Sequence, residues 1–128
     1  MILADIELDN IRAVETYLSK NYRWEINLPK LTKIAGMNER KLRHGFKQLY
    51  SNTMRDYDVG LKMDAAKRLL LDESKSIQEV AEQVGYKSSS TFIRAFEKMF
   101  GVNPSLWRKI QKKSEQVNSG RFRSIFEL

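Results

Sequence analysis

The sequence contains no cysteine and a single histidine, His44. Without cysteine, disulfide bonds, thiolate catalysis and cysteine-ligated zinc sites are all excluded. A metal site built from several histidines is excluded as well, and no nucleophile or carboxylate motif surrounds His44 to make it catalytic. We therefore expect no metal ion, no other cofactor and no enzymatic activity.

Long apolar runs are also missing. No stretch approaches the roughly 18 apolar residues that indicate a membrane span. The N-terminal residues include Asp5, Glu7 and Asp9, which is the wrong charge for a signal peptide. Together with the lack of cysteine, these absences predict a cytoplasmic protein that does not bind a membrane.

The chain does have an excess of basic charge. Its 128 residues include 23 lysines and arginines against 16 acids, which gives a formal net charge of +7. This sign favours an anionic partner such as nucleic acid or a membrane surface, although a solvated basic surface is the plainer alternative. The first twenty residues contain four acids and two bases, so we expect the N-terminal helix to lie away from an anionic partner.

Helical periodicity dominates, and no convincing strand pattern is present. The only prolines, Pro29 and Pro104, lie one or two residues after an asparagine, in the first turn of a helix. Ser76 and Glu79 have the spacing of a capping box. These signals predict an all-α fold of about seven helices. The expected helices are 8–20, 28–35, 39–50, 54–72, 77–84, 89–100 and 104–112.

The chain also contains an internal repeat. In the first copy Gly36 follows one apolar periodic segment and precedes a second, and Gly85 does the same in the second copy, 49 residues later. After the glycine the offset is 50 residues, because the second turn is one residue longer. The matched positions are Leu28 with Ile77, Leu31 with Val80, Leu42 with Phe92, Phe46 with Phe96, Tyr50 with Phe100, and Tyr57 with Trp107. Each copy reads as helix, turn and helix, which is the pattern of a helix-turn-helix.

The repeat sets the domain organisation. We expect one domain over residues 8–110, with unit one at 8–53, a linker helix at 54–72 and unit two at 73–110. Residues 111–128 form a C-terminal tail that is loose or makes a short final turn. Gly60 lies inside the linker helix, where glycine costs about 1 kcal/mol, and this suggests a bend or fraying.

The second helix of the first copy has an aromatic side and a basic side. The basic side holds Arg40, Arg43, His44 and Lys47. Arginine pairs bidentately with guanine and lysine binds phosphate, so we favour a recognition surface over a merely solvated one. On such a surface His44 could donate to a phosphate or to a base edge.

The second helix of the second copy is less basic. Its outer side carries Ser89, Ser90, Ile93, Arg94 and Glu97. Ile93 is either an isolated surface isoleucine or a contact for a thymine methyl group. Glu97 would be repelled by phosphates; it either pairs with Arg94 or Arg108 or accepts from a cytosine amino group.

The stretch SIQEVAEQVGYKSSSTFIRAFEKMFGVNPSLWRKI resembles the signature of the AraC/XylS family of bacterial transcription regulators. The segments LPKLTKIAGMNERKLRHGFKQLYSNTMRDY and LKMDAAKRLL are also similar to the family, and the resemblance covers residues 8 to 110. Glu97 departs from the pattern, since the family often has lysine there. The matching positions are Ile77, Ala81, Gly85, Tyr86, Phe92, Arg94, Phe96, Lys98, Gly101, Pro104 and Arg108.

The resemblance implies a domain that binds double-stranded DNA through two recognition helices in successive major-groove segments, about 34 Å apart. A linker helix of about 17 residues spans about 25 Å, so a monomer could place both recognition helices in the major groove. By position, base contacts fall on Arg40, Arg43, His44, Ser89, Ser90, Ile93 and Arg94. Phosphate contacts fall on Lys47, Lys87, Ser88, Lys98 and Arg108, with Ser88 also expected as a helix cap. RNA polymerase is a further implied partner.

Most members of the family also carry an effector-binding or dimerisation domain. We expect this chain to be the C-terminal domain of a longer regulator rather than a stand-alone member. Family-like units also occur in methyl-transfer DNA repair proteins, but those need a reactive cysteine, which is absent here. A protein-binding adaptor is the other alternative, and the arginines clustered over apolar anchors argue against it.

Overall fold

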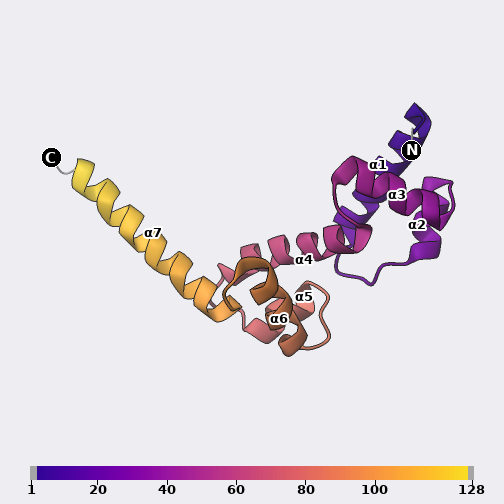
Figure 1. Ribbon diagram of the computed structural model, residues 1–128. Coiled ribbons are helices and arrows are strands. Elements are labelled where there is room, and N and C mark those ends of the chain that lie inside the picture. Colours follow the sequence, from indigo (N-terminus) through magenta and orange to yellow (C-terminus); the bar gives the residue numbers. More distant parts are fainter. Residues whose placement is uncertain (1–2, 127–128) are drawn as a thin grey trace. The chain divides into compact units, whose positions relative to one another are not determined.

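The computed structural model describes residues 3–126, with side chains as far as Gln116. Seven α-helices and no strand occur within the described chain, so the predicted all-α class is confirmed (Figure 1). None of the described helices is long and apolar enough to cross a membrane. The helices are α1 (Asp5–Asn21), α2 (Leu28–Ala35), α3 (Glu39–Tyr50), α4 (Met54–Leu70), α5 (Ile77–Gln83), α6 (Ser89–Phe100) and α7 (Pro104–Phe126).

Polar side chains begin the helices where the sequence predicted. Asn27 accepts from the Lys30 amide at the start of α2, and Ser76 accepts from the Glu79 amide at the start of α5. Asn103 accepts from the Leu106 amide at 2.8 Å at the start of α7. Each of these bonds satisfies a main-chain N–H that has no partner inside the helix.

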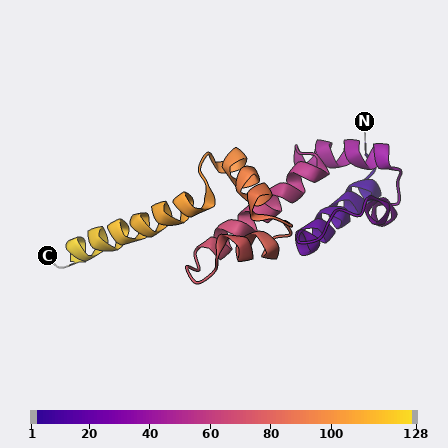
Figure 2. The same cartoon turned by 90° about the horizontal axis from the view of Figure 1, so that it is seen from below.

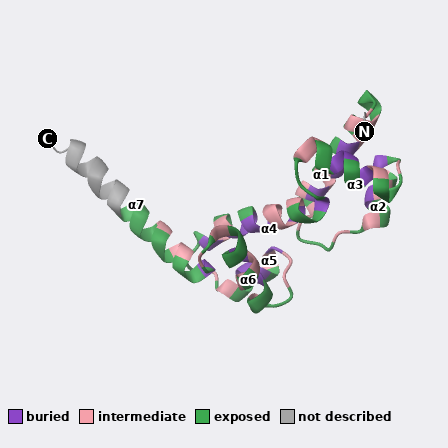
Figure 3. Ribbon diagram, in the orientation of Figure 1, coloured by how far each residue is buried: buried purple, intermediate pink, exposed green. Residues whose placement is uncertain are grey.

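The chain divides within α4 into two compact units, one up to Ala65 and the other from Ala66 on. In the first unit, α1, α2, α3 and the beginning of α4 surround a buried core (Figure 3). Phe46 of α3 is fully buried there and packs against Tyr57 of α4 with ring centroids 5.4 Å apart. The buried members of this core are Ile11, Val14, Leu18, Leu31, Ala35, Leu42, Phe46 and Met54.

The second unit repeats this arrangement. Phe96 of α6 is fully buried, and its ring lies 6.1 Å from that of Trp107 in α7. Both aromatic pairs meet edge to face, at 82° for Phe46 with Tyr57 and at 75° for Phe96 with Trp107. The repeat read from the sequence therefore corresponds to a repeated packing arrangement.

The turns of the two units need a left-handed residue at matched positions. Gly36 and Gly85 both have positive φ, at 64° and 101°; Gly36 follows α2 directly, and Gly85 lies two residues after the end of α5. The ends of α3 and α6 also match, with φ of 60° at Ser51 and 79° at Gly101. A side chain disfavours this conformation, so glycine is the better residue there and Ser51 is the exception.

The expected end of the last helix was wrong. The sequence predicted that the last helix ends near residue 112, yet α7 continues to Phe126 (Figure 2). The Ser119–Gly120 pair disfavours a helix without terminating it, since one glycine costs only about 1 kcal/mol. Gly60 does not fray α4, which is helical from Met54 to Leu70, while a bend at this residue stays a prediction.

Candidate nucleic-acid interface

The rotation of α3 about its axis is fixed by its buried residues. Leu42, Gly45 and Phe46 face the core, and Asn38 caps the helix by accepting from the Lys41 amide at 2.9 Å. A methyl group on Gly45 would lie 2.5 Å from Cδ1 of Ile11, so the glycine lets α1 approach α3 closely. This packing directs the opposite side of α3 to solvent.

That exposed side carries the four basic residues singled out in the sequence. Arg40, Arg43, His44 and Lys47 are all exposed, as predicted. We call these four residues the α3 face. Their exposure and common direction give them access to a partner, and their side chains supply only donors if His44 is protonated.

Carboxylates hold the cations at the two edges of this surface. Glu39 accepts a 2.9 Å hydrogen bond from Nε of Arg43, and Glu7 of α1 forms an ion pair with Lys41. The hydrogen bond from Lys41 is the main cause of a lowered pKa of Glu7, followed by that from the Ala4 amide. Within the described residues, Arg40, His44 and Lys47 make no ion pair.

The corresponding start of α6 is a cluster of hydroxyl groups. Ser88 caps the helix as predicted, accepting from the Thr91 amide at 3.3 Å. Its Oγ also lies 2.7 Å from Oγ1 of Thr91 and 3.3 Å from Oγ of Ser90. These hydroxyls satisfy one another and the helix end, which leaves less of their bonding capacity for a partner.

The remaining predicted residues of α6 differ in exposure. Ser90 and Arg94 are exposed, whereas Ser89 and Ile93 are half-buried. Glu97 is exposed and pairs with neither Arg94 nor Arg108 in the described part of the chain, which removes the pairing explanation for its place. Two predicted phosphate contacts, Lys87 and Lys98, are exposed near the two ends of α6.

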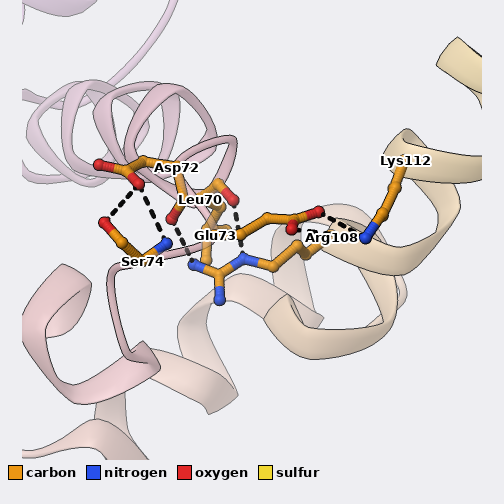
Figure 4. Close-up of polar contacts among 6 residues, drawn as sticks. All are labelled: Leu70, Asp72, Glu73, Ser74, Arg108 and Lys112. Carbon is orange, nitrogen blue, oxygen red and sulfur yellow. Dashed lines mark hydrogen bonds and ion pairs between the residues drawn. The ribbon is translucent and has the colours of Figure 1, made fainter.

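Arg108 has a structural role that the sequence reading missed (Figure 4). Its Nε donates to the carbonyl of Leu70 at 2.7 Å, and one terminal nitrogen donates to the carbonyls of Lys75, at 2.8 Å, and Asp72, at 3.4 Å. These carbonyls end α4 or follow it, where a helix leaves acceptors unpaired. This placement does not support the predicted phosphate contact, because the guanidinium is engaged inside the protein.

Neighbouring polar contacts strengthen the same junction. Lys112 of α7 pairs with Glu73 at 3.1 Å. Asp72 accepts from the hydroxyl of Ser74 at 2.6 Å and from its amide at 3.0 Å, and these bonds lower the pKa of Asp72. The start of α7 is thereby tied to the loop between α4 and α5.

In the first unit a buried ion pair takes the equivalent place. Nζ of Lys62 lies 2.5 Å from Oδ2 of Asp58 and also donates to the carbonyl of Tyr22, just beyond α1. Burial raises the pKa of Asp58, although the bond and charge of Lys62 act in the opposite direction. Both residues contribute to packing rather than to the α3 face.

Comparison with known proteins shows to which family the chain belongs. A model of the helix-turn-helix domain matches residues 31–110. The chain belongs to the AraC-type helix-turn-helix family of DNA-binding transcription regulators. Among its relatives, the raffinose operon regulatory protein RafR of Pediococcus pentosaceus is 31% identical over 94 residues, covering 73% of this chain and 34% of RafR. The melibiose operon regulatory protein of Escherichia coli K12 is 26% identical over 104 residues, covering 81% and 34%.

Another relative is the bifunctional transcriptional activator and DNA repair enzyme AdaA of Bacillus subtilis. It is 27% identical over 108 residues, covering 84% of this chain and 51% of AdaA. The chain thus spans between a third and about half of the length of these relatives. The chain is therefore similar in sequence to one part of each of these regulators.

Solved structures share the fold. The C-terminal domain of AraT, a response regulator from Geobacillus stearothermophilus, superposes with a TM-score of 0.73 at 26% identity, covering 86% of this chain and 88% of that one. The DNA-binding domain of AdpA, solved with a target DNA, superposes with a TM-score of 0.75 at 20% identity, covering 82% and 95%. At this identity the second likeness concerns the fold alone.

Proposed function

We propose that this chain binds a specific double-stranded DNA sequence and thereby regulates bacterial transcription, with α3 and α6 in successive major-groove segments. The observation that carries the proposal is the α3 face: four basic or protonatable side chains project from one side of a helix whose other side is buried. Arginine at a major groove recognises guanine by its forked donors. The AdpA domain, of the same fold, was solved with target DNA.

The proposed roles follow exposure and chemistry. Arg40 and Arg43 read guanines, with His44 beside them, and Lys47 binds phosphate. In the second unit Arg94 is the main base-reading residue, supported by Ser90, Ser89 and Ile93. Phosphate contacts fall on Lys47, Lys87 and Lys98. Ser88 also contacts phosphate, through the part of its hydroxyl that the bond to the Thr91 amide leaves unused. Arg108 is left out of the DNA-contacting set because of its internal bonds.

The proposed cellular setting comes from the family. RNA polymerase is the proposed partner in regulation, and an effector-binding or dimerisation domain is proposed to accompany this one in the complete regulator. The proposed location is the cytoplasm. We assign no catalysis to the chain, since it has no cysteine for methyl transfer.

Selection of bound duplexes from a random DNA pool at physiological salt tests this function. We expect one asymmetric sequence to be enriched, and to bind about a thousandfold more tightly than a scrambled duplex of equal length. Affinity for both duplexes should fall as salt is raised, because bound lysines and arginines displace counterions.

The adaptor alternative predicts the opposite results. A protein-binding domain would enrich no DNA sequence, and its binding to a protein partner would change little with salt. Either a failure to enrich any sequence or equal affinity for selected and scrambled duplexes would contradict specific DNA binding.

A further inference from the structure

Glu39 has an unexpected charge for its position. It lies in the first turn of α3, beside the α3 face, and its side chain is 55% exposed. An acid in a first turn stabilises a helix through the helix dipole. Next to DNA, however, a carboxylate is repelled by phosphates, so by charge alone Glu39 would weaken the proposed binding.

The contact between Glu39 and Arg43 explains what the acid could contribute. Oε1 of Glu39 accepts from Nε of Arg43 at 2.9 Å. Within the described residues, the two terminal nitrogens of Arg43 have no hydrogen-bond partner. These nitrogens form the end-on fork that matches O6 and N7 of guanine. The two terminal nitrogens of Arg43 are therefore free to bind, while Glu39 holds the guanidinium at Nε.

Arg43 is the only residue of the α3 face held in this way in the described structure. Arg40, His44 and Lys47 make no ion pair there, and Glu7 holds Lys41, which lies outside the face. A side chain oriented before binding loses less freedom when it binds. It also adapts less readily to a base that presents a different pattern of donors and acceptors.

We propose that Glu39 is a specificity-determining positioning residue, which holds the Arg43 guanidinium end-on toward one guanine and so disfavours other bases at that position. The inference rests on the proposed function, since it requires α3 to enter a major groove. Glu39 itself contacts no base in this arrangement, and its effect passes through Arg43.

Two substitutions separate the bond from the charge. Glu39→Gln and Glu39→Ala remove the same charge, but only glutamine keeps an acceptor oxygen at the same reach. Binding is measured to the duplex selected with the wild-type chain, to its single-base variants and to a scrambled duplex. Both variants should bind the scrambled duplex about twofold more tightly, since each removes one repelling charge.

Only Glu39→Ala should flatten the preference at the base pair that Arg43→Ala also affects. The discrimination between base pairs at that position should fall about threefold, which is the size of effect measured for other exposed ion pairs. This fall should disappear when Glu39→Ala is made in the Arg43→Ala background. Glu7→Gln is the matched control: it removes the same charge from the partner of Lys41 and should leave every base preference unchanged.

The outcomes distinguish the inference from the proposed function. If Glu39→Ala keeps all base preferences on a duplex that is still bound selectively, the positioning role is overturned while DNA recognition stands. If Glu39→Ala and Glu39→Gln change all positions equally, only charge is involved and the role is again overturned. If no duplex is selected by the wild-type chain, both ideas fail.

Discussion

The helices α3 and α6 have the same framework but different exposed surfaces. Each has 12 residues, a capping side chain at its start, two buried hydrophobic residues four positions apart and a left-handed residue at its end. The outer side of α3 carries Arg40, Arg43, His44 and Lys47, whereas that of α6 carries two serines, an isoleucine, one arginine and a glutamate. The comparison shows that packing constrains one side of such a helix and leaves the other free to diverge in chemistry.

The helices that close the two units also differ in their anchors. In unit one, Lys62 of α4 donates to the carbonyl of Tyr22 and pairs with buried Asp58. In unit two, Arg108 of α7 donates to three carbonyls at or just after the end of α4, and among the described side chains it pairs with no carboxylate. Asp58 and Arg108 are matched positions of the repeat, 50 residues apart. The donor to a carbonyl beyond an earlier helix is thus Lys62, held by Asp58, in unit one, and Arg108 itself in unit two.

The largest effect is expected from Lys62→Met. It leaves the buried carboxylate of Asp58 without its cation and should destabilise the chain by about 3–5 kcal/mol. Urea unfolding followed by circular dichroism measures this loss. The double variant Asp58→Asn with Lys62→Met removes both charges and should recover much of it. A double variant as unstable as Lys62→Met would show that the unpaired carboxylate of Asp58 is not the cause of the lost stability.

A smaller loss is expected from Arg108→Ala. Three carbonyls at the α4–α5 junction lose a charged donor, which should cost about 1–3 kcal/mol in urea unfolding. The salt dependence of DNA binding should stay unchanged, because Arg108 contacts no phosphate in this arrangement. Unchanged stability with a salt slope reduced by about one unit would instead support the phosphate contact predicted from the sequence.

The close approach of α1 to α3 gives the next test. Gly45 corresponds to Ala95 in the second copy, 50 residues later. Gly45→Ala places a methyl group against Cδ1 at the end of the buried Ile11 side chain, which must shift, and this overpacking should cancel the helix propensity of about 1 kcal/mol that alanine brings. The matched change Ala95→Gly should cost about 1 kcal/mol from propensity alone. A stabilising Gly45→Ala in urea unfolding would contradict the close packing.

The smallest expected difference between the two units is in how their stability changes at alkaline pH. Tyr57 of unit one stands where unit two has Trp107. Burial, with the hydrogen bond to Glu15, raises the pKa of Tyr57 to about 12. The contribution of Tyr57 to the free energy of unfolding is complete below the pKa of tyrosine in the unfolded chain, about 10. It is lost as pH rises through the folded value, because the unfolded phenol ionises first.

Unfolding measured at about pH 8 and about pH 11 should therefore show a loss in the wild type that is smaller in Tyr57→Phe. Trp107 does not ionise, so unit two contributes no such term from this position. An equal loss in both proteins would assign the alkaline sensitivity to other groups.

Local sequence signals predicted most of this fold. The caps at Asn27, Ser76 and Ser88 and the spacing of Phe46 and Phe96 determine where helices begin and which sides are buried. These signals act within a few residues, so a single sequence displays them. The exposure of the α3 face follows from the same periodicity.

The missed features depend on contacts between distant residues or on weak local preferences. Arg108 meets Leu70 across 38 positions, and Lys62 meets Tyr22 across 40. No local pattern distinguishes such a side chain from a solvent-exposed base. The continuation of α7 past residue 112 depends on small preferences that do not add up to a clear stop signal. The bond between Glu39 and Arg43 has the common spacing of a surface pair, so its meaning depends on the orientation of α3.

The most direct test of the difference between α3 and α6 is a scan of every single-base substitution in the selected duplex, made with the wild type, Arg40→Ala and Arg94→Ala. We expect two sensitive segments about ten base pairs apart. Arg40→Ala should erase about 1–3 kcal/mol of discrimination in one segment, and Arg94→Ala should erase less in the other. The segment that Arg40 reads should hold the larger total discrimination. Because α3 has two exposed arginines and α6 has one, a larger total in the segment read by Arg94, or one segment affected by both substitutions, would contradict the account.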